Sequence, residues 1–346
     1  MMPAWEGRGG LQGKGKPSPR PGRSFYGGFL WALALMTMAS APAGAIDPAA
    51  GTGGAAFLKL GQGSARAMAM GRAYVPLAEG SDALTWNPAG LAQTQQRELA
   101  YSYLRHVQDL DTPLYLAYAH PMGRTVWGAN LAYLSADGFD VRDANGVPQP
   151  NEGVNVRDGF GTLGVGRSFW YEKLFLGGAL RVVHENIAGS VHNTLVGDFG
   201  AIGKPTNILS LGFAVQNFGT SLANAASVVR GGAGLRAGEF LTLGLELNKA
   251  KDSGVRVGVG GEFQLPEEYL EVGQLTFRIG YHKTDNLGQS FDDTLKDLRL
   301  DRTSGLSFGF GLYTSQAFGY GLALDYAFVP FGALGTVDQI SLKLKF

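Results

Sequence analysis

Large apolar residues occupy every second position over most of the chain after residue 96. In the run GYGLALDYAF, at 319–328, the even positions are large and apolar, and the odd positions are small or charged. Successive side chains of a β-strand point to opposite faces of a sheet, so this alternation predicts strands with one apolar face. The same pattern recurs at 207–218, 240–249, 273–284 and 303–314. The chain after residue 96 is therefore predicted to be all-β.

The residues on the opposite face of these strands distinguish a soluble sandwich from a membrane barrel. They are mostly glycine and alanine with isolated charges, whereas the core of a sandwich needs branched and aromatic residues. Small and charged residues fit the interior of a closed barrel, where charges pair or meet water. The charged residues predicted to face this lumen are Glu246, Arg256, Glu262, Arg278, His282 and Asp325. They would pair to brace the wall or hold a plug, or they would line a permeation path.

The pattern predicts a transmembrane antiparallel β-barrel of about fourteen strands, with twelve or sixteen as the alternatives. The expected strands are 97–105, 112–121, 124–136, 158–170, 173–187, 191–203, 207–218, 227–237, 240–249, 253–265, 273–284, 303–314, 318–329 and 336–346. Segments of about ten residues match the tilted span of a hydrocarbon core. The two longest connections, 137–157 and 285–302, are odd-numbered. They would therefore be extracellular if both ends of the barrel chain face the periplasm.

The first 45 residues have the features of a secretory leader. Basic residues precede the apolar run FLWALALMTMA, which is followed by SAPAGA. A basic region, an apolar core too short to span a bilayer and a small-x-small end predict a signal peptide that is cleaved after Ala45. The alternative is a membrane-anchoring helix that begins at Phe25. The chain has no cysteine, which is compatible with an oxidising compartment.

The residues between the leader and the first strand lack the alternation and are rich in glycine and alanine. Asp82 stands where it would cap a short helical turn through Trp86, and Pro88 and Gly90 then break the chain. Asn87 would hold this bend through hydrogen bonds to the local backbone. A fourteen-stranded barrel is too wide to be filled by its own side chains. We therefore expect these residues to form a hatch inside the lumen, with Trp86 packed against the wall.

The chain is therefore predicted to have three parts. They are a leader and signal peptide at 1–45, an N-terminal hatch or plug at 46–96 and the transmembrane barrel at 97–346.

Two stretches carry a resemblance to a known family. They are FLKLGQGSARAMAMGRAYVPLAEGSDALTWNPAGLA at 57–92 and DYAFVPFGALGTVDQISLKLKF at 325–346. Both resemble the PorV/PorQ family of outer-membrane proteins, which is itself similar to the FadL long-chain fatty-acid transporters. The chain departs from the family pattern at Arg72, where a second glycine is usual, and at Glu79, Gly80 and Ser81, where an acidic pair is commoner before Asp82. The role of Arg72 is open at this point.

The resemblance implies a FadL-like fourteen-stranded barrel whose hatch contains the Asn-Pro-Ala turn. The last strand, QISLKLKF, ends at Phe346 and resembles the signal by which Gram-negative outer-membrane barrels are passed to the assembly machinery. The expected location is therefore the outer membrane, with its lipid and the barrel assembly machinery as partners.

Members of this family divide between two functions, and both remain open here. One is passive transport of hydrophobic small molecules across the outer membrane, which requires an apolar pocket. The candidate pocket residues are Phe57, Leu58, Met68, Met70 and Tyr74, with Trp86 beside them. The other is a partner or anchor of a type IX-like secretion or surface-assembly system, with the long loops as contact surfaces.

The features expected for nucleic-acid binding, dinucleotide binding, calcium binding or catalysis are absent or incomplete in the sequence. The chain has 29 basic and 29 acidic residues, so its zero net charge gives no electrostatic reason to expect nucleic acid. GFGTLG at 159–164 matches a dinucleotide-binding pattern but lies within a predicted strand with no helix after it. The acidic run at 137–146 lacks the last glutamate of a calcium loop. The five histidines are scattered, with no recognisable nucleophile nearby. We expect no enzyme activity, no cofactor and no metal.

Overall fold

The computed structural model describes residues 52–61, 63–106, 111–142, 147–270, 273–282, 305–317, 319–330 and 336–346. They belong to one compact unit, Pro42–Phe346. The predicted leader, its cleavage site and the connection 285–302 lie outside the described residues.

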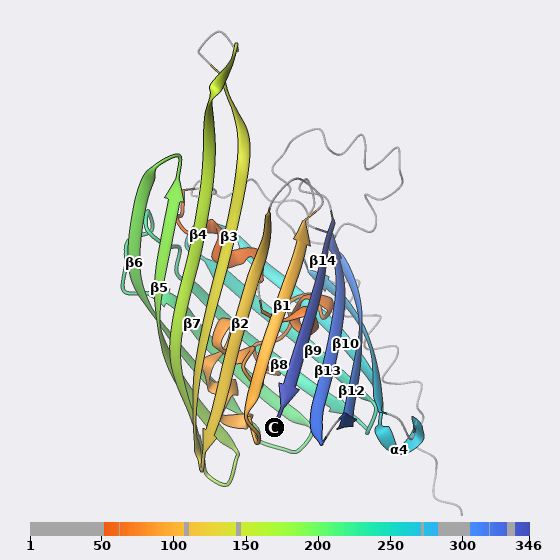
Figure 1. Ribbon diagram of the computed structural model, residues 1–346. Helices are drawn as coiled ribbons and strands as arrows, with labels where there is room; N and C mark the ends of the chain where they lie inside the picture. The colour runs from red at the N-terminus through yellow and green to blue at the C-terminus, as the bar shows by residue number, and fades with distance from the viewer. Residues whose placement is uncertain are drawn as a thin grey trace, which may run out of the picture. The chain divides into compact units, whose positions relative to one another are not determined.

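Fourteen antiparallel strands form a closed barrel, which confirms the predicted fold class and strand number (Figure 1). The strands are β1 Glu98–His106, β2 Asp111–Met122, β3 Thr125–Arg142, β4 Pro148–Phe169, β5 Leu174–Ile187, β6 Ser190–Gly203, β7 Leu209–Phe218, β8 Val228–Ala237, β9 Leu241–Ala250, β10 Val255–Leu265, β11 Gln274–His282, β12 Leu306–Ala317, β13 Tyr320–Pro330 and β14 Thr336–Lys345. A short helix, α4 (Glu267–Leu270), lies between β10 and β11. Each strand pairs with its neighbours in sequence, and β1 closes the barrel against β14, from Glu98 opposite Lys345 to His106 opposite Val337.

The strands β3 and β4 are longer than predicted. The range 137–157 was expected to be a loop, but β3 continues to Arg142 and β4 begins at Pro148. The backbone pairing continues with Phe139 opposite Val154, with register shifts on either side. Figure 1 shows this hairpin projecting beyond the neighbouring strands. The sequence-based prediction was wrong here because it followed side-chain alternation, whereas backbone pairing alone extends the hairpin.

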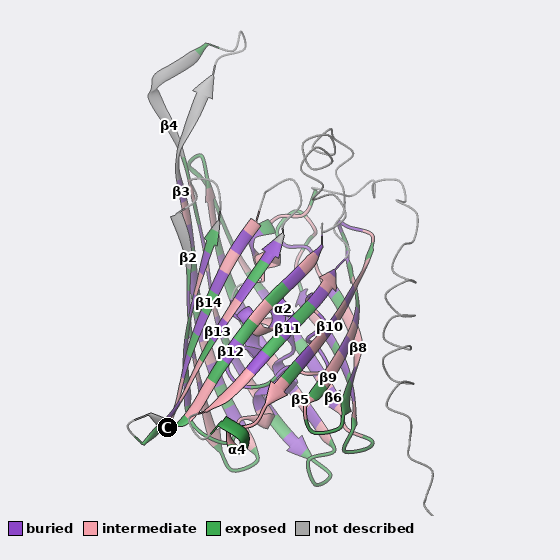
Figure 2. Cartoon of the chain, turned by 90° about the vertical axis from the view of Figure 1, so that its right-hand side faces the viewer, coloured by how far each residue is buried: buried purple, intermediate pink, exposed green. Residues whose placement is uncertain are grey.

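The two faces of the barrel have opposite chemistry. In β14, Ile340 and Leu342 are exposed on the outer face, whereas Ser341 and Lys343 are buried. Figure 2 shows the same alternation of buried and exposed residues along β11 and β12. An apolar outer face around a polar interior is typical of barrels that span a membrane. No helix among the described residues is long and apolar enough to cross a membrane.

Residues 52–97, which we call the N-terminal segment, lie inside the barrel (Figure 1). They form η1 (Ala56–Leu60), α2 (Ala65–Ala69), α3 (Ala83–Trp86) and η2 (Pro88–Gln93). Helix α2 contacts β11 to β14, and η2 contacts β3 to β6. The segment begins near the seventh connection, where the Gly54 N–H donates to the Leu222 carbonyl, and Arg97 pairs with Phe346 at the opposite end. It therefore runs through the lumen from end to end.

Inward-facing glycines allow the N-terminal segment to approach the wall closely. A Cβ at Gly280 would lie 1.9 Å from the Gly71 nitrogen, and one at Gly177 would lie 2.3 Å from the Pro88 carbonyl carbon. Both distances are too short for a side chain to be added without a shift of the backbone. The many glycines of the chain thus have a packing role where the segment touches the wall.

Candidate functional site

A network of ion pairs holds α2 to one side of the lumen. The Glu262 carboxylate on β10 accepts hydrogen bonds from Arg66 of α2, at 2.8 and 2.9 Å, and from Arg278 on β11, at 2.7 Å. Arg278 also pairs with Asp325 on β13 at 2.7 Å. Arg66 pairs in addition with Glu79 of the segment. Buried charges are stable only when they are paired, and here each predicted wall charge of this group has a partner.

The second anchor joins Asp82 to the last strand. The Lys343 ammonium donates to the Asp82 carboxylate at 2.7 Å, and both side chains are buried. Asp82 precedes α3 but makes no side-chain cap hydrogen bond to that helix. The prediction that Asp82 caps the turn was therefore wrong. Its carboxylate is used in a long-range ion pair, because an ammonium group inside the lumen needs a counter-ion.

The third anchor is the Glu246 carboxylate on β9. It accepts the backbone N–H groups of Tyr74, at 3.1 Å, and Val75, at 3.0 Å, and pairs with Arg230 on β8 at 2.9 Å. The other two predicted lumen residues are Arg256 and His282. His282 is buried and interacts electrostatically with Arg256 and Arg72. The six predicted residues thus fall into two groups, one around Glu262 and one around Glu246.

The turn TWNPAGLA is tied to both the N-terminal segment and the wall. The Asn87 Oδ1 accepts the Ala89 N–H at 3.2 Å, and its Nδ2 donates to the carbonyls of Val75, at 3.0 Å, and Ala201 on β6, at 3.3 Å. Pro88 lies against Gly177 and Gly200 of the wall. Gly90 approaches the Ala78 carbonyl so closely that a Cβ would lie 2.3 Å from its oxygen.

Trp86 is buried between the N-terminal segment and the wall. Its ring packs edge-on against Tyr74 with 6.0 Å between centroids, and the Arg230 guanidinium lies 5.0 Å from its centroid. A cation over an indole face is an attractive contact, stronger when shielded from water. Trp86 therefore joins the segment to β8.

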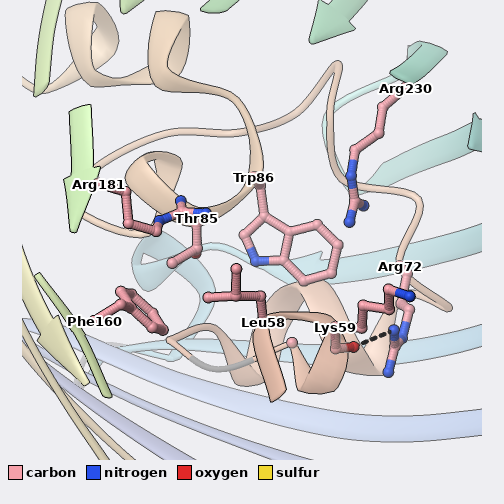
Figure 3. Close-up of a pocket in the computed structure, with 9 residues that line it drawn as sticks. Leu58, Lys59, Arg72, Thr85, Trp86, Phe160, Arg181 and Arg230 are labelled. Atoms are coloured by element: carbon pink, nitrogen blue, oxygen red, sulfur yellow. Dashed lines mark hydrogen bonds between the residues drawn. The ribbon is translucent and has the colours of Figure 1, made fainter. Parts of the chain in front are cut away.

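A small cavity lies beside Trp86 (Figure 3). Its lining residues are Leu58, Lys59, Gly61, Arg72, Thr85, Trp86, Phe160, Arg181 and Arg230. Its volume is about 20 Å³, which is room for about one water molecule. A cavity that takes benzene measures about 150 Å³, so this one is too small for an aromatic hydrocarbon as it stands.

The five predicted pocket residues are not gathered around this cavity. Leu58 lines it, whereas Phe57 packs against Phe160 with 6.1 Å between ring centroids. Met68 and Tyr74 belong to a separate buried cluster that contains Trp86. Met70 is buried against the wall at Gly260. These residues pack the segment against itself and against the barrel.

Four of the residues that line the cavity are basic, and three of them, Lys59, Arg181 and Arg230, are paired with carboxylates. Arg72 donates to the Lys59 carbonyl at 2.9 Å, and its backbone has a φ of +62°. Burial, together with the positive charges of Arg230 and Arg256, lowers the pKa of Arg72 to about 9, although Glu246 opposes this shift. Lys59 pairs with Asp252, which lies in the connection after β9. Burial is the largest cause of this shift, because a buried base disfavours its charged form, and the two neighbouring arginines add to it.

Sequence reasoning missed Arg181 and Arg230 as cavity residues. Arg181 pairs with Asp198 at 2.7 Å and lies 5.2 Å from the Phe160 centroid. Each arginine stands in the same alternating phase as inward-facing glycines, for example Gly177 before Arg181. The same alternation that identified Glu246 and Arg278 as inward-facing also places Arg181 and Arg230 on the inner face.

The remaining candidates are placed as follows. GFGTLG lies within β4. Phe346 packs edge-on against Tyr320 with 6.5 Å between ring centroids. His184 and His192 are exposed and bond to Asn193 and Ser190, respectively. The described residues contain no cluster of three His, Cys, Asp or Glu side chains that would hold a metal ion.

Comparison with known proteins finds similarity at the level of structure. No family model and no curated protein sequence matches the chain. The Ralstonia pickettii toluene transporter TbuX is similar, with a TM-score of 0.58 and 13% identity, over 83% of this chain and 98% of that one. A Pseudomonas aeruginosa FadL homologue has a TM-score of 0.51 and 10% identity, over 82% and 98% of the two chains.

A third similar structure is a mutant of the TodX monoaromatic hydrocarbon channel, with a TM-score of 0.52 and 12% identity, over 77% of this chain and 93% of that one. The chain has a FadL-like fold. At these identities the similarity concerns the fold alone, and the resemblance to PorV/PorQ stays a prediction.

Proposed function

We propose that this chain is a passive outer-membrane channel for hydrophobic small molecules. The observation that carries the proposal is a FadL-like barrel whose lumen is filled by its own N-terminal segment. A general diffusion pore needs a water-filled lumen. Here the cavity beside Trp86 has room for about one water molecule. A route that opens only when part of the segment moves would admit selected ligands and exclude hydrophilic solutes.

The proposed channel would be exported and would lie in the outer membrane. The outer face of β11 to β13 has an apolar groove lined by Phe277, Phe308, Phe310 and Tyr326, which would contact membrane lipid. The leader would direct export, with cleavage after Ala45, and the strand ending at Phe346 would be read by the barrel assembly machinery. No catalytic activity is assigned to the chain.

Uptake measurements test the channel function. The full chain is expressed in a Gram-negative strain that lacks its own hydrophobic-compound transporter, and initial uptake of radiolabelled oleate and hexadecane is measured. We expect uptake several-fold above that of cells with an empty vector. The amount of folded barrel is matched by its heat-modifiable migration on gels. No gain at a matched amount of folded barrel would contradict the proposal.

A second candidate function is a non-transporting partner of a secretion or surface-assembly system. It is favoured by the tight filling of the lumen and by the long hairpin of β3 and β4. Removing residues 141–152 joins Asp140 to Gly153 directly beyond the Phe139–Val154 pair. Asp-Gly suits a two-residue hairpin turn, so this hairpin-shortened variant should keep the barrel intact. Loss of copurifying proteins from it, with uptake absent in both forms, would favour the partner function over the channel.

A further inference from the structure

The N-terminal segment contacts both strands that close the barrel. Strands β1 and β14 are the first and the last of the barrel, and they lie side by side at what we call the β1–β14 junction (Figure 1). Ser81 of the segment donates to the Glu98 carboxylate on β1 through its backbone N–H, at 2.8 Å, and its hydroxyl, at 2.6 Å. The next residue, Asp82, accepts the Lys343 ammonium of β14 at 2.7 Å. Two consecutive residues of the segment thus bridge the two strands from the lumenal side.

A second contact with the junction lies at Ser341 on β14. The Ala65 N–H of the segment donates to the Ser341 hydroxyl at 3.0 Å, and that hydroxyl lies 3.0 Å from the Ser102 hydroxyl on β1. Gln339 of β14 also donates to Ser102 at 3.0 Å. These polar side chains are at most 2% exposed, so their hydrogen bonds are shielded from water. The segment therefore contacts the junction at two buried places.

The β1–β14 junction joins the most distant parts of the barrel chain. Ser102 and Ser341 are 239 residues apart, whereas the other strand pairs join neighbours in sequence. Bringing distant residues together costs chain entropy before their contacts form. Ser81 and Glu98, by contrast, are only 17 residues apart, so the segment can dock on β1 through a local contact. The docked segment then presents a carboxylate beside β1, where β14 has to arrive.

The path of the segment argues against its entry into a barrel that is already closed. It runs from the seventh connection at one end of the lumen to Arg97 at the other, and Arg97 continues directly into β1. Entry after closure would require the segment to thread through the barrel with its N-terminal end first. A Cβ at Gly280 would lie 1.9 Å from the Gly71 nitrogen, so the segment and the wall are in backbone contact. Closure of the wall around a segment already in place avoids this threading.

We propose that the N-terminal segment is a template for barrel closure, which docks on β1 first and then receives β14 at Ser81 and Asp82. This role in assembly goes beyond the proposed channel function, and it is independent of whether the closed barrel transports a ligand. It has two measurable consequences. Protection of the segment precedes or accompanies β1–β14 pairing, and the rate of that pairing depends on the two bridging residues.

The order of events is measured with a cross-link across the junction. The chain has no cysteine, so Leu99→Cys with Leu344→Cys places a single thiol pair on opposite residues of β1 and β14, on the outer face. Residues 46–346 are refolded from urea into detergent micelles, with samples treated with a short bismaleimide or pulsed with deuterium. We expect amide protection in residues 78–97 to appear no later than the cross-link. A cross-link that forms fully before the segment is protected would overturn the proposal.

Substitutions confined to the segment test the rate of closure. Ser81→Ala with Asp82→Asn removes the hydroxyl bond to β1 and the charge that pairs with β14, and leaves both strands unchanged. We expect cross-linking to be at least about fivefold slower, because contacts formed before the transition state set the folding rate. Ser81→Ala alone leaves the buried charges paired and should show part of this slowing. The order measured in the parent chain remains decisive even where the double variant does not fold.

Asn87→Ala is the matched control for these substitutions. It removes buried hydrogen bonds from the same segment to Val75 and to Ala201 on β6, away from the junction. We expect it to leave the rate of cross-linking unchanged. An unchanged rate in the Ser81→Ala, Asp82→Asn variant, or equal slowing in Asn87→Ala, would overturn the proposal.

Discussion

Inward-facing glycines set how closely the N-terminal segment approaches the wall. Two adjacent glycines of β5 test this, because only one of them faces the segment. A Cβ at Gly177 would lie 2.3 Å from the Pro88 carbonyl carbon, whereas one at Gly178 would meet nothing nearer than the Asp198 oxygen at 3.7 Å. The two positions share a strand and differ in the face to which they point.

Gly177→Ala should therefore destabilise the packed segment, and Gly178→Ala should not. Overpacking of this kind typically costs about 1–3 kcal/mol. We expect faster protease cleavage within residues 78–97 of the folded Gly177→Ala barrel, measured by limited proteolysis and mass spectrometry. Equal cleavage of the two variants would mean that the segment does not rest on this part of the wall.

The ion pair between Asp82 and Lys343 is a second residue-scale test. Asp82→Asn leaves a buried ammonium group without its counter-ion, and breaking a buried pair in this way costs about 3–5 kcal/mol. We expect faster amide hydrogen exchange in α3 and η2, while the strands keep their protection. The double variant Asp82→Asn with Lys343→Met removes the unpaired charge and should restore much of the protection. Unchanged exchange in Asp82→Asn would contradict the anchoring role.

The limits of sequence reasoning are clearest at single residues. Asp82 looked like a helix cap because Asp is common at that position, but its partner Lys343 is 261 residues away. Only the closed barrel brings the two together. Arg278, Glu262 and Asp325 were recognised as inward-facing from their phase, because period-two alternation reports the face of a strand. The position of a residue in this alternation does not show which residue its charge pairs with inside the lumen.

Strands were predictable as elements wherever one of their faces meets lipid. The alternation located all fourteen strands. It did not predict the ends of β3 and β4, because these extend by backbone pairing. The N-terminal segment has no such period, and its path depends on contacts with glycines spread over the wall. Its presence could be expected from the width of the barrel, but its anchors could not.

The hairpin-shortened variant tests whether the barrel folds without the β3–β4 extension. Its new Asp140–Gly153 turn has the residues that a tight hairpin prefers. We expect the same heat-modifiable migration and the same unfolding midpoint as the parent protein. A failure to migrate as a folded barrel would show that the extension contributes to closure.

The whole molecule is a barrel with its apolar face outward and its charged face inward, and the lumen is filled by the same chain. The buried charges of the three anchors are paired, Arg66 with Glu262, Arg230 with Glu246 and Lys343 with Asp82. A filled lumen excludes hydrophilic solutes unless the segment is released. In the proposed channel, selectivity for hydrophobic ligands and closure to polar solutes would both follow from this filling of the lumen.

The most direct measurement compares two solutes in the same transporter-deficient cells. Initial uptake of radiolabelled oleate and of a radiolabelled hydrophilic sugar is measured with matched amounts of folded wild-type and Asp82→Asn barrel. The account predicts a several-fold gain for oleate and none for the sugar with the wild type, and a gain for the sugar once Asp82→Asn loosens the segment. No gain for oleate, or an equal gain for the sugar with the wild type, would contradict it.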